Sequence, residues 1–93
     1  MELICSKKLE LNVELDCKTK ELYLEYYLIA CESENFCTYG IQISMAKDNG
    51  ESETAVIHDI LSSKENMIEL IKLLYSNSVT PVSAYDVICD CIS

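Results

Sequence analysis

The sequence contains no arginine, because all seven of its basic residues are lysines. Two-pronged recognition of phosphate and of guanine depends on the guanidinium fork, which lysine cannot imitate. Sixteen acidic residues bring the formal net charge to −9. We therefore expect no nucleic-acid partner, and the negative charge also argues against an anionic membrane surface.

Glycine and proline are also scarce, with two glycines and one proline in 93 residues. Gly40 and Gly50 alone cannot supply a glycine-rich phosphate loop, so we expect no nucleotide partner. The same scarcity leaves no linker or low-complexity segment, and no internal repeat is visible. A chain of this length has room for one core, which predicts a single domain over residues 1–93.

Long apolar runs are missing as well, since no stretch approaches the roughly 18 residues that span a bilayer. The first five residues lack the basic-then-apolar order of a signal peptide. We therefore expect a soluble, cytoplasmic protein. Six cysteines would suggest disulfides in a secreted chain, but their irregular spacing and the high apolar content favour free thiols that pack as small apolar residues.

Alternation of apolar and polar residues predicts strands in the first two thirds of the chain. Residues 9–15 alternate strictly, which indicates a strand with one wet face, and the polar residues 16–20 suit a hairpin connection. Residues 22–31 are largely apolar at both alternate sets of positions, which is typical of a central strand covered on both sides. After a loop at residues 32–35, residues 39–46 alternate again.

The dipeptide Asn49-Gly50 is a strong hairpin signal, and the returning strand is expected over residues 52–59. A two-residue loop would place Ile41 opposite His58. A three-residue loop with Gly50 as a left-handed bulge would place Ile41 opposite Ile57, and this one-residue difference turns the whole strand over. We favour the longer loop because it buries Ile57 and leaves His58 on the wet face.

Two helices are expected after the strands. Ser62 and Glu65 have the spacing of a capping box, and the helix that they open should end near Ser76, with Asn77 in the left-handed conformation. Its buried stripe consists of apolar residues three and four apart, namely Met67, Leu70, Ile71 and Leu74, with Ile68 and Tyr75 at its edge.

The second helix should take Thr80 as its cap and Pro81 as its first residue. Four of its residues are expected to face the core, namely Val82, Tyr85, Ile88 and Ile92, whereas Asp86 and Asp90 should face water. Strands first and helices last predict an α+β fold, in which an antiparallel meander of about four strands is packed on one face by two C-terminal helices.

Several short motifs, in this order, resemble a small bacterial domain family of about a hundred residues. They are Tyr26-Tyr27-Leu28, Tyr39-Gly40-Ile41, His58-Asp59-Ile60, Val79-Thr80-Pro81-Val82 and Tyr85-Asp86-Val87. The resemblance covers most of the chain from the second strand onward and implies the same order of strands and helices. The family has no assigned function, so the resemblance implies no catalytic residues.

The cysteines are the first candidates for chemistry. Cys89 and Cys91, with Cys31 and Cys37, could supply four thiolates to zinc. A one-residue gap in a helix places two side chains about 200° apart, so Cys89 and Cys91 cannot share one ion. We therefore expect no metal and no cofactor, and a small metal-binding or thiol-redox protein is the alternative.

Catalysis without a metal would have to use His58 or Glu25. His58 is the only histidine, but no cysteine stands in a recognisable nucleophile context. Its neighbour Asp59 should point to the opposite face of the strand and so cannot orient the imidazole. Glu25 lies on the apolar central strand, where burial would raise its pKa and make it an acid or base. We expect no enzyme, and a small enzyme that uses Glu25 or His58 is the second alternative.

The two helices can cover only one face of the sheet. Tyr23, Tyr27 and Ile29 should lie on the other face, where they would form an apolar patch with the amphipathic character of an interface. We therefore expect a non-enzymatic interaction or regulatory domain. Its partner would be another protein or, most simply, a second copy of the chain in a two-fold homodimer.

Overall fold

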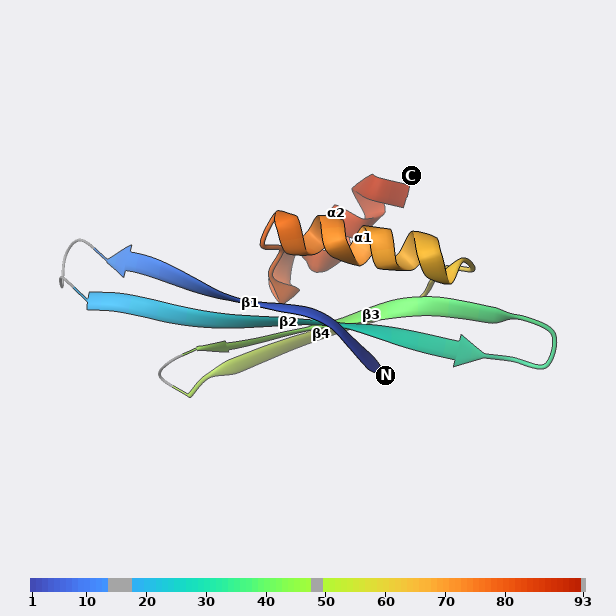
Figure 1. Cartoon of the computed structure of the whole chain (residues 1–93), viewed down its shortest axis with the longest axis horizontal. Helices are drawn as coiled ribbons and strands as arrows, with labels where there is room; N and C mark the ends of the chain where they lie inside the picture. The colour runs from blue at the N-terminus through green and yellow to red at the C-terminus, as the bar shows by residue number, and fades with distance from the viewer. Residues whose placement is uncertain (14–17, 48–49, 93) are drawn as a thin grey trace.

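The computed structural model describes residues 1–13, 18–47 and 50–92. Its elements follow one another as β1 (Glu2–Val13), β2 (Lys18–Glu32), β3 (Cys37–Lys47), β4 (Ser52–Leu61), α1 (Lys64–Ser76) and α2 (Pro81–Ile92). The strands pair antiparallel in the order β1-β2-β3-β4, and both helices lie on one side of the sheet (Figure 1). The predicted α+β meander with two C-terminal helices is confirmed.

The sheet is much longer than the helices that cover it. β2 has 15 residues and therefore spans about 50 Å, whereas the 13 residues of α1 span only about 20 Å. The hairpins at both ends of the sheet accordingly extend past the helices (Figure 1). No helix in the described part of the chain is long and apolar enough to cross a membrane.

β1 begins earlier than its alternating residues indicate, at Glu2. Residues 14–17, which complete the predicted 9–15 strand and begin the predicted 16–20 connection, lie outside the described residues. The predicted connection is too long, because residues 18–20 already belong to β2. β2 is a central strand as predicted, because it is hydrogen-bonded to β1 and to β3. The expected cover on both sides is wrong: Leu24 and Tyr26 are fully buried under the helices, whereas Tyr23 on the other face is 42% exposed.

The register of the β3–β4 hairpin follows the longer of the two predicted loops. Ile41 pairs with Ile57, and Gly50 has the left-handed φ of 92° that the bulged loop requires. The backbone N–H of Lys47 donates to the carbonyl of Glu51 over 2.8 Å and closes the turn. Residues 48 and 49 of the predicted turn lie outside the described residues.

α1 buries the predicted stripe of Met67, Leu70, Ile71 and Leu74. It ends at Ser76 as predicted, but its cap and the left-handed residue that follows it each lie one residue later than predicted. The cap is Ser63 and not Ser62, because the Ser63 hydroxyl accepts a hydrogen bond from the backbone N–H of Asn66 over 3.3 Å. At the other end Asn77 has a φ of −95°, and the left-handed residue is Ser78, with a φ of 52°.

The two neighbouring serines allow the cap to be tested by a matched pair of variants. Ser63→Ala should lower the free energy of unfolding by about 1 kcal/mol, because the N–H of Asn66 loses its acceptor. Ser62→Ala should change it by less than about 0.5 kcal/mol, because Ser62 is exposed and precedes the cap. Urea denaturation of both variants measures the difference, and equal losses would contradict the assignment of the cap.

α2 begins at Pro81 as predicted, but it presents a different face to the sheet. Val82 is 78% exposed and Tyr85 is 65% exposed, so neither faces the core. The buried positions are Pro81, Ala84 and Ile88, and the small side chain of Ala84 lets the helix approach β3 and β4 closely. Ile88 and the exposed Asp86 and Asp90 agree with the prediction, and the side chain of Ile92 lies outside the description.

A buried tyrosine connects the sheet to the turn between the two helices. The hydroxyl of Tyr26 on β2 donates to the backbone carbonyl of Val79 over 2.9 Å, and its ring meets the ring of Tyr75 edge to face at 6.1 Å. Lys7 on β1 donates to the hydroxyl of Ser78 over 3.0 Å and lies 4.3 Å from the centre of the Tyr75 ring. These contacts fix where the first helix ends relative to the strands.

Candidate functional site

The face of the sheet opposite the helices, called here the open face, carries several of the residues that the sequence singles out. On β2 it presents every second residue, namely Glu21, Tyr23, Glu25, Tyr27, Ile29 and Cys31. The predicted interface residues Tyr23, Tyr27 and Ile29 lie together there, the first exposed and the other two half-buried.

Neighbouring strands add further apolar groups to this row. Leu3 on β1 is the register partner of Tyr27 and is 51% exposed. Val56 on β4 pairs with the open-face residue Gln42 of β3 and is 46% exposed. The open face therefore carries uncovered apolar side chains from three of the four strands.

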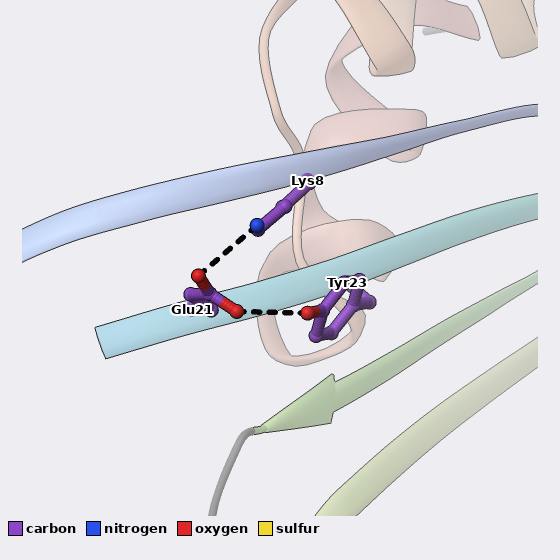
Figure 2. A network of polar contacts seen from close by, with 3 residues as sticks. All are labelled: Lys8, Glu21 and Tyr23. Atoms are coloured by element: carbon purple, nitrogen blue, oxygen red, sulfur yellow. Dashed lines mark hydrogen bonds and ion pairs between the residues drawn. The ribbon is translucent and has the colours of Figure 1, made fainter. Parts of the chain in front are cut away.

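A polar network holds the aromatic ring at the start of this row (Figure 2). Glu21 forms an ion pair with Lys8 at 3.0 Å, and the hydroxyl of Tyr23 donates to the second oxygen of Glu21 over 2.8 Å. The bond to Lys8 and then the bond to Tyr23 lower the pKa of Glu21. Lys8 and Tyr23, with Ser6 and Glu25, also line an open hollow of about 300 Å³ between β1 and β2.

Glu25, a predicted acid or base, lies half-buried on the open face and accepts a hydrogen bond from the hydroxyl of Tyr27. This bond is the main cause of a raised Tyr27 pKa, because the carboxylate disfavours the ionised phenol beside it. Glu25 is six residues along β2 from Cys31, which corresponds to about 20 Å of strand. The structure therefore does not join Glu25 and His58, which contacts Cys31, in one site.

The other predicted candidate, His58, does meet a nucleophile. Its Nδ1 lies 3.5 Å from the Sγ atom of Cys31, although Cys31 is on β2 and His58 is on β4. Strands two apart in a sheet are separated by about 10 Å, so a regular ladder would not bring these side chains together.

A bulge in β4 closes that gap. Tyr39 pairs with Leu61 while Ile41 pairs with Ile57, so residues 58–60 of β4 all lie opposite Gly40. A Cβ atom on Gly40 would lie 2.2 Å from the Ile57 carbonyl oxygen and 2.9 Å from the His58 Cα. Because Gly40 has no side chain, β4 can pass directly over it on the open face and approach β2.

The bulge also redirects the residue after His58. Asp59 adopts a left-handed φ of 54°, which breaks the alternation of the strand, and it accepts a hydrogen bond from the hydroxyl of Thr38. Thr38 is the register partner of Cys31, so His58 and Asp59 contact two directly opposed residues. The prediction that His58 and Asp59 must point to opposite faces is wrong for this reason.

A family model described as a family of unknown function, DUF6514, matches residues 2–93. The chain belongs to this family. The expected resemblance to an uncharacterised family is thereby confirmed, and the four strands and two helices are the fold of a DUF6514 domain. No curated protein and no solved structure matches the chain.

Family membership assigns no chemistry to the other thiols of this DUF6514 domain. Cys5, Cys37 and Cys89 are half-buried and free, and Cys91 is free and exposed. Burial raises the pKa of the Cys5 thiol. Among residues 1–13, 18–47 and 50–92, no three His, Cys, Asp or Glu side chains are grouped so that they could hold a metal ion.

Sequence reasoning missed the partnership of Cys31 and His58 in this domain. The available signal was Gly40, because an isolated glycine inside a strand often marks a bulge or the close approach of another backbone. His58-Asp59 on the pairing strand was the place to look for that bulge. Nothing in the sequence indicates that Cys31 is the residue that His58 contacts across β3.

Proposed function

We propose that this DUF6514 domain is a non-enzymatic interaction module whose open face binds a second copy of the chain. The observation that carries the proposal is the row of apolar side chains on the face turned away from α1 and α2, with Tyr23 42%, Val56 46% and Leu3 51% exposed. Tyrosine suits such a surface, because its ring is apolar and its hydroxyl retains a polar partner. We place this interaction in the cytoplasm.

The distribution of charge supports contact between two open faces despite the net charge of −9. Four exposed carboxylates lie on the helices, on the other side of the sheet, and they are Glu65, Glu69, Asp86 and Asp90. On the open face of β2, Glu21 is bonded to Lys8 and Tyr23, and Glu25 is bonded to Tyr27. A quarter of the sixteen acidic residues therefore lies away from the proposed contact, and the two carboxylates in the row on β2 already have partners within the chain.

Two tyrosines on opposite sides of the molecule provide a matched test. Tyr23→Ser should raise the dissociation constant of the dimer by about tenfold or more, because it removes an exposed aromatic ring from the contact. Tyr85→Ser makes the same chemical change at a site 65% exposed on α2 and should leave the constant unchanged. Sedimentation velocity over a concentration series measures both.

Salt separates self-association from binding to a basic protein. Two acidic chains repel each other, so added salt should strengthen the dimer, whereas it would weaken a complex with a basic partner. A strict monomer at millimolar concentration would overturn the proposal. So would a dimer that Tyr85→Ser dissociates and Tyr23→Ser does not, because it would form through the helices.

A further inference from the structure

The contact between Cys31 and His58 has the composition of an activated thiol. A nitrogen base lies 3.5 Å from a free thiol, within the range of a hydrogen bond to sulfur. His58 is exposed and Cys31 is half-buried, so a small solute can reach the sulfur. Both groups belong to the open face, outside the core.

Two unusual features of the backbone hold this contact together, and two neighbouring surface side chains would meet without either of them. Gly40 leaves the space that β4 crosses. Asp59 has a left-handed φ of 54°, a conformation that is unfavourable for any residue other than glycine. The bond from Thr38 to Asp59 holds the bulge next to Cys31. Bulges occur often in edge strands such as β4 and next to active sites, where they re-aim a side chain.

We propose that Cys31 is a reactive thiol, that His58 is its general base, and that its co-reactant is a small hydroperoxide. The Sγ proton passes to Nδ1 of His58, and the thiolate attacks one peroxide oxygen. An S–O bond forms as the O–O bond breaks, and the departing oxygen takes the proton back from His58 and leaves as water or an alcohol. The sulfur loses two electrons and becomes a sulfenic acid, and the peroxide is reduced.

Exposure alone makes the opposite prediction about which cysteine reacts first. Cys91 is exposed, whereas Cys31 is half-buried. If access to solvent decided the rate, Cys91 would be modified before Cys31. If the imidazole decides it, Cys31 reacts first, because the thiolate is the nucleophile and His58 generates it.

The test is peroxide oxidation of the full chain, with the sulfenic acid trapped by dimedone and quantified for each cysteine by mass spectrometry. Hydrogen peroxide should modify Cys31 about tenfold faster than Cys91. His58→Asn should bring the Cys31 rate down to that of Cys91. Thr54→Asn places the same amide at an exposed position of the same strand and should leave the Cys31 rate unchanged.

Two results would overturn the proposal. One is a wild-type chain in which Cys31 reacts no faster than Cys91, and the other is a His58→Asn variant, folded by circular dichroism, that keeps the wild-type rate. The ranking within the wild-type chain holds even if the variant fails to fold. Measuring the rates at a concentration where the chain is monomeric, and again in Tyr23→Ser, keeps this test separate from the proposed dimer.

Discussion

Gly40→Ala should lower the free energy of unfolding by about 3 kcal/mol, because the added methyl group meets the backbone of β4. The added Cβ would lie 2.2 Å from the carbonyl oxygen of Ile57 and 2.9 Å from the Cα of His58. Both neighbours are backbone atoms, so neither can move aside by a change of rotamer. The bulge in β4 must shift away, and with it the pairing around Ile41.

Gly50→Ala is the matched control, because it makes the same change where the space is open. Among the described residues, its chain neighbours aside, no atom lies within 4 Å of the Cβ that it would add, but Gly50 has a φ of 92°. Its cost is therefore conformational, about 1 kcal/mol. Urea denaturation should place Gly40→Ala well below Gly50→Ala, and the reverse order would show that β4 does not cross Gly40.

Gly40→Ala also connects stability to the proposed thiol. Pushing the bulge off Gly40 withdraws His58 from Cys31, so the folded variant should oxidise Cys31 no faster than Cys91. If the variant loses stability but still oxidises Cys31 quickly, the reactivity of the thiol does not depend on the bulge. The two measurements therefore test the same crossing of β4 by independent means.

The parts of the fold that could be read from the sequence are those with one strong local cause. The stripe of α1 follows from apolar spacing, since Met67, Leu70, Ile71 and Leu74 are three and four residues apart and share one face of the helix. The β3–β4 register follows from loop length and from the left-handed tolerance of Gly50. Each of these depends on residues that are close in the chain.

The errors arose where the sequence offered two nearly equal choices. α2 is apolar around most of its circumference, so the sequence makes Val82 and Tyr85 as plausible as Pro81 and Ala84 as core neighbours of Ile88. The structure selects the face with the smaller residue, because it permits closer packing, and that preference depends on the partner surface. The cap of α1 presented a similar choice, because Ser62 and Ser63 are adjacent and either hydroxyl could cap the helix.

The contact between Cys31 and His58 could not be predicted from the sequence, because it joins two strands that do not pair with each other. Alternation placed both residues on the open face, and a regular sheet would have kept them about 10 Å apart. Only the crossing over Gly40 brings them together. Turn chemistry and periodicity carry no direct information about such a crossing.

Tyr26→Phe is the second substitution with a large expected effect, and it acts on the contact that anchors the helices. Tyr26 is fully buried, and its hydroxyl donates to the carbonyl of Val79 over 2.9 Å. Removing the hydroxyl leaves that buried carbonyl without its partner, which should lower the free energy of unfolding by about 2 kcal/mol. Tyr27→Phe removes a hydroxyl that donates to Glu25 on the open face, and it should destabilise the fold less than Tyr26→Phe at neutral pH because no buried group is left without a partner.

The same hydroxyl gives the fold a specific dependence on alkaline pH. Burial, with the neighbouring Cys5 and Tyr75, raises the pKa of Tyr26 from 10.0 to about 12, because the ionised phenol is disfavoured inside the core. A raised pKa in the folded state means that the contribution of Tyr26 is fully present below pH 10 and is lost as the pH rises through about 12. Tyr26→Phe has no phenol to ionise at this position, so the stability gap between it and the wild type should narrow between about pH 9 and about pH 11.5. Because both proteins share every other titrating group, a gap that stays constant or widens over that range would show that the Tyr26 hydroxyl is not buried against Val79.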